Sequence, residues 1–278
     1  MLLLAIVCAA LLAGLLVCAQ SGAFATFTWL WMLPVTALCV FAGIVLLGFL
    51  GLLYMCKRVD QTKPQEEDDK FYRIVADLVI GAALPFLRIR IKKSGLEKVP
   101  AEGRFLLVCN HCNNADPIIL LHVLRKFQMA FISKRENSTM FVIGPMMHKL
   151  QCQLINREND REALKTILKC IQILKEDKAS IAVFPEGGIL SEDGKLHHFR
   201  PGVFKIAQKA NVPIVVCTLH NTKDVVHNIL HLKPSSVQMK VLEVIPAEEL
   251  KGVTTVDISK RCYELMAADL GPDLIAED

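Results

Sequence analysis

The 278-residue chain is 53% hydrophobic and has a formal net charge of +4 at pH 7, which fits one large domain with an appendage. No dense stripe of lysine and arginine with interleaved aromatic residues occurs in it, and this excludes a typical nucleic-acid-binding surface. The ten cysteines are scattered mostly singly, as is typical of reduced thiols facing the cytosol and not of a disulfide framework. The apolar excess lies at the start of the chain, because no charged residue or histidine precedes Lys57.

Two apolar runs, residues 2–19 and 27–56, are each long enough to cross a bilayer as a helix. Trp29 and Trp31 lie near the start of the second run, where interfacial aromatic residues are common. We therefore predict that residues 1–58 form a membrane anchor, most simply a hairpin of two helices.

The orientation of this anchor follows from the basic residues at its end. Lys57 and Arg58 place both ends of the hairpin, and the rest of the chain, on the cytoplasmic face by the positive-inside rule, at the cell membrane if the source is bacterial. Two alternatives stay open. Residues 1–19 could be a signal peptide, although they lack the usual charged beginning, and the hairpin could enter one leaflet without crossing.

The remainder of the chain is predicted to be a linker, residues 59–70, followed by one domain, residues 71–278. Residues 71–87 are apolar with few charges and predict a helix that either lies on the bilayer or packs in the core of the domain. Residues 88–93 follow it as a strand with alternating basic residues.

From residue 104 onward, short apolar runs alternate with segments of helical periodicity. Strands are predicted at residues 104–109, 129–133, 151–155, 180–184, 212–217 and 237–244. Helices are predicted at residues 117–127, 160–176, 202–210 and 254–267. Strands separated by helices indicate an α/β fold with a mainly parallel sheet and flanking helices.

His111 and Asp116 follow the first strand of this region and form a candidate catalytic pair. On an ideal helix, residues five apart point about 140° away from each other, so the two side chains can meet only in a turn. Turns at strand ends are where α/β proteins place active sites. A neutral imidazole there can take a proton from an attacking alcohol, and a carboxylate on its other nitrogen fixes the tautomer.

Three other interpretations of the same segment stay open. Asp116 before Pro117 is a good helix cap, so it could serve only to start a helix. Cys109, His111 and Cys112 resemble half of a zinc site, although a second ligand pair is missing from the sequence. Cys112 could also act as a nucleophile beside His111 and form a covalent intermediate.

Basic residues mark several predicted strand ends. Lys134 and Arg157 each follow a strand, and Arg200 precedes a helix. Charge clusters are usually solvated, but basic groups at successive strand ends favour an anion site, and phosphate suits arginine well. Gly187 and Gly188 lie in a turn after another strand and would allow a ligand to approach the backbone closely. An ordinary glycine-rich turn without a ligand would have the same sequence pattern.

Taken together, these motifs resemble the glycerolipid acyltransferase family, whose bacterial form is 1-acyl-sn-glycerol-3-phosphate acyltransferase. The first family block is His-x₄-Asp, matched by His111 and Asp116. The second is a basic residue after a strand, a Gly-Pro and a strand ending in Ile-x-Arg. Lys134, Gly144-Pro145 and Ile155-Asn156-Arg157 match it in that order.

The two later blocks also occur in order. The third, Phe-Pro-Glu-Gly-Thr-Arg, is matched by residues 184–187 only, because Gly188 and Ile189 replace the final Thr-Arg. The fourth is a basic-x-Gly segment before a Val-Pro-Ile-Val strand, matched by residues 200–202 and 212–215. The resemblance covers roughly residues 104 to 216, and four ordered blocks are far more specific than one His-x₄-Asp.

The resemblance implies that an acyl thioester, on coenzyme A or acyl carrier protein, gives its acyl group to the free hydroxyl of 1-acyl-sn-glycerol-3-phosphate. Phosphatidic acid, a phospholipid precursor, would be the product. His111 would be the base and Asp116 its orienting partner, with no metal or other cofactor and no nucleic-acid partner. The residues implied to bind the acceptor and its phosphate are Lys134, Arg157, Glu186, Gly187, Gly188 and Arg200.

The replacement of the family's arginine by Ile189 leaves the acceptor open, because isoleucine cannot bind a phosphate. Lys134, Arg157 or Arg200 could bind the phosphate in its place. Alternatively, the acceptor is another lyso-lipid or an amphipathic alcohol. A lipid-binding protein without catalytic activity is the alternative from outside the enzymes, and an intact His-Asp pair argues against it.

Overall fold

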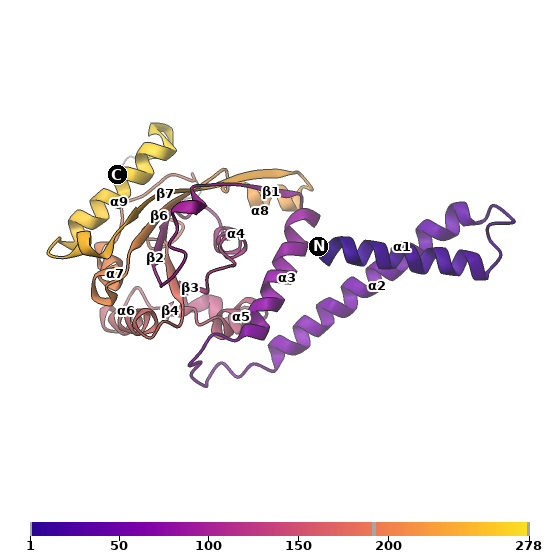
Figure 1. Cartoon of the computed structure of the whole chain (residues 1–278), viewed down its shortest axis with the longest axis horizontal. Helices are drawn as coiled ribbons and strands as arrows, with labels where there is room; N and C mark the ends of the chain where they lie inside the picture. The colour runs from indigo at the N-terminus through magenta and orange to yellow at the C-terminus, as the bar shows by residue number, and fades with distance from the viewer. Residues whose placement is uncertain (1, 191–192, 277–278) are drawn as a thin grey trace.

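A computed structural model describes residues 2–190 and 193–276. It shows an α/β domain from which a long pair of helices projects (Figure 1). The seven strands are β1 (Ile89–Ser94), β2 (Leu106–Cys109), β3 (Met129–Lys134), β4 (Gln153–Ile155), β5 (Ser180–Val183), β6 (Ile214–His220) and β7 (Ser235–Ile245). The predicted fold class is therefore confirmed.

The seven strands form one sheet in the order β1-β7-β6-β2-β5-β3-β4. The five strands from β6 to β4 are mutually parallel, whereas β7 runs antiparallel to β6 and pairs in parallel with β1. The carboxyl ends of the five parallel strands therefore lie along one edge of the sheet, where open α/β sheets bind their ligands.

The helices of the domain cover both faces of this sheet (Figure 1). They are α3 (Lys70–Phe86), α4 (Asp116–Val123), α5 (Ile143–Lys149), α6 (Asp160–Lys175), α7 (Lys205–Ala210), α8 (Val225–Leu230) and α9 (Thr255–Leu270). Short 3-10 helices connect several of them, and one, Pro201–Phe204, leads directly into α7.

Strand β2 shows why the sheet is buried on both sides, since all four of its residues are buried. Leu106 and Val108 pack in one core with α6, α7 and α9. Leu107 and Cys109 pack in a second core with α3, α4 and α8. The alternation follows from the strand period of two, and the burial explains why such strands read as continuous apolar runs.

The two projecting helices, α1 (Leu2–Gln20) and α2 (Trp29–Lys57), pack against each other as a hairpin. They meet closely at Gly14, where an added Cβ would lie 3.0 Å from the side chain of Leu33. Both helices are long and apolar enough to cross a membrane by length and composition. Most of their large apolar side chains face outward from the protein, as lipid-facing side chains do.

Helix α3 connects this hairpin to the domain. Its Asp69 cap accepts hydrogen bonds from the backbone N–H groups of Phe71 and Tyr72, which fixes where the helix begins. The Tyr72 hydroxyl donates to the carbonyl of Met55 in α2, 3.2 Å away. Helix α3 also contacts α1, α4 and β1, so it is part of the domain core, and its outer face stays exposed and apolar.

Two helices were absent from the prediction made from sequence. Helix α5 has seven residues and contains Gly144 and Pro145, and α8 has six residues and no side-chain cap. Such short segments present too few turns for a helical period to be recognised, and tertiary packing stabilises them instead. The predicted helix at residues 202–210 is divided between the 3-10 helix and α7.

Gly144 generates a testable prediction about α5. A Cβ at this position would lie 2.1 Å from the carbonyl oxygen of Ser138, so Gly144→Ala must displace α5 from the neighbouring 3-10 helix, Arg135–Thr139. We expect the free energy of unfolding to fall by about 1–3 kcal/mol, the usual effect of overpacking. Thermal melting in detergent micelles measures it. Gly202→Ala, which meets open space, is the matched control and should melt like the unchanged protein.

Candidate active site

The parallel strand ends bring together most of the residues that the sequence analysis singled out. His111 follows β2, Phe184 follows β5, Lys134 ends β3 and Arg157 follows β4. All four line one cavity. Residues that are up to 73 positions apart in the chain therefore meet because the strands that carry them are neighbours in the sheet.

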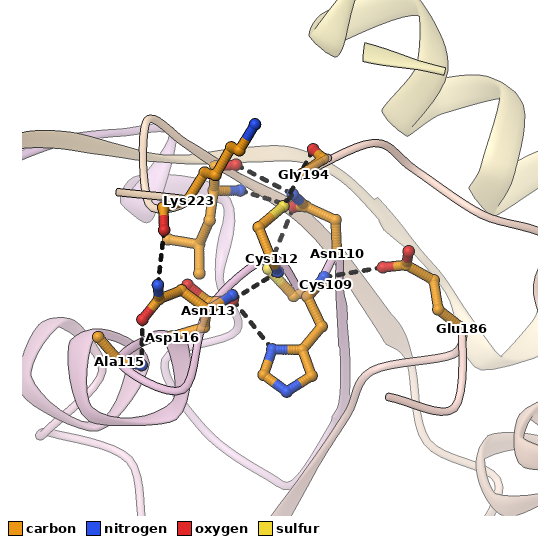
Figure 2. A network of polar contacts seen from close by, with 11 residues as sticks. Cys109, Asn110, Cys112, Asn113, Ala115, Asp116, Glu186, Gly194 and Lys223 are labelled. Carbon is orange, nitrogen blue, oxygen red and sulfur yellow. Dashed lines mark hydrogen bonds and ion pairs between the residues drawn. The ribbon is translucent and has the colours of Figure 1, made fainter. Parts of the chain in front are cut away.

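His111 and Asp116 are in direct contact. The ring Nδ1 of His111 lies 2.9 Å from Oδ2 of Asp116, whose side chain is fully buried. The same oxygen accepts hydrogen bonds from the backbone N–H groups of Cys112 and Asn113, both at 2.8 Å (Figure 2). The loop between β2 and α4 is thus wrapped around one carboxylate oxygen, as the prediction of a turn required.

This geometry assigns the protons. An ionised carboxylate only accepts hydrogen bonds, so Nδ1 of His111 carries the proton that it donates to Asp116. Nε2 is then the unprotonated nitrogen of the neutral ring and faces the cavity that His111 lines. This is the tautomer that a general base needs.

The alternative that Asp116 serves as a helix cap is wrong. The cap residue of α4 is Ala115, and Asp116 is the first helical residue. Its carboxylate accepts no hydrogen bond from the first turn of the helix and instead faces back toward the loop that carries His111. Its other oxygen, Oδ1, is buried without a hydrogen-bond partner among the described residues, a cost that a purely structural cap would not carry.

Glu186 holds the backbone of His111 in place. One oxygen of its carboxylate accepts a hydrogen bond from the N–H of His111 at 2.8 Å, and the other from the N–H of His197 at 3.0 Å. Burial raises the pKa of Glu186 to about 7, an effect that the two backbone hydrogen bonds and the nearby Asp116 only modify. Glu186 does not line the cavity, so the structure places it behind the site and not against an acceptor.

Two further residues position the pair, and the sequence analysis gave neither a role. The ring of Phe184 stacks on that of His111 with centroids 4.0 Å apart. The Asn110 side chain exchanges two hydrogen bonds with the backbone of Leu219, at 3.0 and 2.8 Å, and joins the end of β2 to β6. The only signal for the second in the sequence is an asparagine directly before His111.

Cys112 is a poor nucleophile in this setting. Burial, together with the carboxylates of Asp116 and Glu186, raises the pKa of the Cys112 thiol to about 12, so it is not ionised near neutral pH. The zinc alternative fails for a different reason. Cys109 points into the core beneath α4, whereas His111 lines the cavity, and no group of three metal-ligating side chains occurs in residues 2–190 or 193–276.

The cavity has a volume of 930 Å³ and extends from His111 under α3 and α5. Its wall on that side is apolar and is formed by Leu52 of α2 and by residues in or next to α3, α4 and α5, of which only α5 was absent from the prediction made from sequence. The apolar lining comprises Leu52, Ala76, Val79, Ile80, Leu121, Met140, Val142, Ile143, Met146, Met147 and Leu150. This volume is of the size that holds a small organic ligand or a lipid chain.

A cluster of three cations lies at the polar end of the same cavity. Lys134, Arg157 and Arg200 all line it, together with Gly187 and Gly188. Burial lowers the pKa of the Arg157 guanidinium, and the positive charge of Arg200 lowers it further. Like charges held together at a buried surface favour an anionic ligand between them.

The two glycines also have a role that the sequence did not indicate. A Cβ on Gly187 would lie 2.8 Å from Nε of Arg200, and a Cβ on Gly188 would lie 2.6 Å from Nη1 of Arg157. Their φ angles of 89° and 150° also disfavour a side chain. The missing side chains therefore make room for the two guanidinium groups of the protein itself.

The structure thus brings a histidine held by a carboxylate together with three cations and an apolar wall around one cavity. Residues 90–220 match the family model described as Acyltransferase. This part of the chain is therefore similar to the acyltransferase family, as the four sequence blocks predicted.

Curated relatives agree with this assignment. The chain is 29% identical over 215 residues to a 1-acyl-sn-glycerol-3-phosphate acyltransferase of Chlamydomonas reinhardtii, covering 74% of this chain and 62% of that protein. It is 33% identical over 155 residues to a chloroplast protein of the same description from Arabidopsis thaliana, covering 55% and 42%. The chain thus matches less than two thirds of the length of either relative.

The fold has a solved counterpart. The crystal structure of the 1-acyl-sn-glycerophosphate acyltransferase PlsC from Thermotoga maritima superposes with a TM-score of 0.61 over 80% of this chain and 87% of that one. Sequence identity to it is 22%, so this comparison establishes the fold.

The raised pKa of Glu186 predicts a change of stability with pH. Because the folded protein holds this proton up to about pH 7 and the ordinary value is 4.5, the folded state binds more protons than the unfolded chain between these limits. The free energy of unfolding therefore falls as pH rises through this window, by up to roughly 3 kcal/mol. Glu186→Gln does not titrate and should lack this fall.

Thermal melting in micelles at about pH 5 and about pH 7.5 measures the difference. The melting temperature of the unchanged protein should fall relative to that of Glu186→Gln as pH rises. Glu158→Gln, at an exposed position, is the matched control and should follow the unchanged protein at both pH values. Parallel pH profiles for Glu186→Gln and the unchanged protein would show that Glu186 holds no such proton.

The thiol of Cys112 supplies a second prediction. If His111 acts as a base on the substrate hydroxyl, Cys112→Ser should keep its activity within a few-fold, because the neutral thiol takes no part in the reaction. A nucleophilic cysteine would instead lose nearly all activity on this change. Steady-state assays and mass spectrometry for an acylated protein distinguish the two routes.

Proposed function

We propose that the protein is an O-acyltransferase that moves an acyl group from a thioester to the free hydroxyl of 1-acyl-sn-glycerol-3-phosphate and so makes phosphatidic acid. The observation that carries this proposal is that His111, a cluster of three cations and a long apolar wall face one cavity. An amphipathic phosphate with a hydroxyl near it fits such a cavity, and the curated relatives named above carry this activity in their descriptions.

The chemistry follows from the tautomer of His111. Nε2 takes the proton of the acceptor hydroxyl as its oxygen attacks the thioester carbonyl, and a tetrahedral intermediate forms. The imidazolium is stabilised by Asp116, 2.9 Å away, which stays ionised. When the intermediate collapses, the carbon–sulfur bond breaks, and the thiolate leaves with the proton that His111 received.

The donor in this proposal is acyl-CoA or acyl carrier protein, and the reaction needs neither a metal nor another cofactor. A thioester is already activated toward attack by an alcohol, so one base and good positioning supply the catalysis. The apolar cavity wall would hold the acyl chain, which removes apolar surface from water and keeps the reacting carbonyl beside His111.

The phosphate of the acceptor would be bound by Lys134, Arg157 and Arg200. Ile189, which stands where the family has arginine, also lines the cavity but adds no charge. The three cations can replace the absent arginine, because guanidinium groups bind phosphate with paired hydrogen bonds. Glu186 would act on His111 and not on the acceptor.

The membrane hairpin would place this reaction beside its lipid substrate. We propose that α1 and α2 anchor the chain in the bilayer with the catalytic domain on the cytoplasmic face, as the Lys57-Arg58 end of α2 favours. Helix α3 would then lie at the membrane surface. An acceptor could pass from the bilayer into the cavity between α3 and α5 with its chain in contact with apolar side chains throughout.

A second candidate acceptor is a different lyso-lipid, and Ile189 is the observation that favours it. An apolar side chain in the cavity next to the cation cluster admits a larger or less charged head group than an arginine would. The reaction and the catalytic pair would be unchanged.

The decisive experiment is an assay in membranes with labelled acyl-CoA and acyl carrier protein against a panel of lyso-acceptors. His111→Ala should lower turnover by about 10²- to 10⁴-fold or more, the usual worth of a general base. Circular dichroism should show that the variant stays folded. Full activity of His111→Ala would refute the mechanism, and transfer to another acceptor in preference to the phosphate monoester would select the second candidate.

Arg157 gives a prediction about the acceptor. Arg157→Gln removes a charge-assisted hydrogen bond to phosphate, so the KM for 1-acyl-sn-glycerol-3-phosphate should rise about 10- to 100-fold. The KM for a lyso-acceptor without a phosphate should change little. Arg161→Gln, an equal change of charge at an exposed position on α6, is the matched control. Equal effects of Arg157→Gln on both acceptors would argue against phosphate recognition by this residue.

A further inference from the structure

The tip around α8, residues 225–234, exposes large apolar side chains and contributes no residue to the cavity lining. Leu230 is 76% exposed and Leu232 is 80% exposed. These are the largest exposed fractions among the large hydrophobic side chains of the described residues, greater than any in the hairpin. Val226 on the same helix is 40% exposed.

The backbone holds these leucines outward. The N–H of Lys233 donates to the carbonyl of Asn228 at 2.8 Å, and the carbonyl of Leu232 accepts from Nη1 of Arg88 at 3.0 Å. Leu232 and Arg88 both have positive φ angles, 55° and 58°, which are uncommon for residues other than glycine. These hydrogen bonds fix the backbone on both sides of the peptide bond between Leu232 and Lys233. The fold therefore holds the leucine side chains in their exposed positions.

The surroundings of the tip are strongly basic. Residues 86–94 and 223–236 contain six lysines and arginines and one acidic residue, Asp224. Arg88, Arg90 and Lys233 are all exposed. Two protruding leucines among cations match an anionic membrane surface, where apolar side chains enter the interface and cations contact lipid phosphates.

The tip also lies on the side of the domain from which the hairpin leaves. Arg88, which donates a hydrogen bond to the carbonyl of Leu232 in the tip, comes two residues after the end of α3. Helix α3 contacts α1, and in Figure 1 the upper end of α3 lies near both α8 and the start of α1. A bilayer that holds the hairpin would therefore be within reach of the tip.

We propose that the α8 tip is a second membrane contact, in which Leu230 and Leu232 enter the interface of a bilayer and the neighbouring cations bind anionic phospholipid head groups. This contact rests on the membrane hairpin and is independent of acyl transfer. Two separate contacts with the bilayer would fix the tilt of the domain, whereas a single hairpin joined by a connecting segment would leave the tilt free.

The test places a fluorescent probe on the tip of the full chain in vesicles. Trp29→Phe and Trp31→Phe remove both native tryptophans, and Leu230→Trp adds one at the tip. In vesicles of phosphatidylglycerol and brominated phosphatidylcholine, the emission should shift to the blue and be quenched. Val256→Trp is the matched control, because Val256 is 61% exposed and its helix, α9, lies at the end of the domain away from the hairpin (Figure 1).

The charges are tested by Arg90→Gln with Lys233→Gln in the probe protein. Each lost cation should shift the equilibrium between the inserted and withdrawn tip by roughly fivefold, so quenching should fall. Quenching at Leu230→Trp no greater than at Val256→Trp would overturn the proposal, and would leave a protein partner as the occupant of the tip. Equal quenching in vesicles without anionic lipid would overturn the role of the cations. None of these measurements depends on acyltransferase activity.

Discussion

The site depends on one carboxylate oxygen. Oδ2 of Asp116 accepts from the ring of His111 and from two backbone N–H groups of the loop that carries it. This single acceptor sets the shape of the loop, the orientation of the imidazole and its tautomer together. Glu186, which follows the neighbouring strand β5, accepts a hydrogen bond from the backbone N–H of His111. Asp116 therefore fixes the ring of His111 and Glu186 fixes its backbone before any substrate binds.

Charge is separated across the cavity in a way that suits the chemistry. Two buried carboxyl groups, Asp116 and Glu186, contact His111 from outside the cavity lining, whereas three cations line the cavity itself. In the proposed reaction, the carboxylate of Asp116 would stabilise an imidazolium that exists only during reaction. The cations would bind the permanent negative charge of the acceptor and so position it. Asp116 would then act on the transition state, and the cations on substrate binding.

The apolar lining of the cavity is continuous from the hairpin to His111. Leu52 of α2, side chains of α3 and the methionines of α5 line the same cavity as His111. If the hairpin is the proposed membrane anchor, it also forms part of the cavity wall. Helix α3 contributes to this wall, belongs to the core of the domain and keeps an exposed apolar face.

The sequence by itself determined the class of fold, the elements with long periodic patterns and the pairing of His111 with Asp116, because each of these follows from a local pattern of residue types. Only the tertiary structure decided that Glu186 supports His111 and that Gly187 and Gly188 make room for arginines. It also decided that the short helix α5 lines the cavity. These contacts depend on which strands are neighbours in the sheet and on how distant segments pack. The spacing of residues along the chain indicates neither the strand order nor this packing.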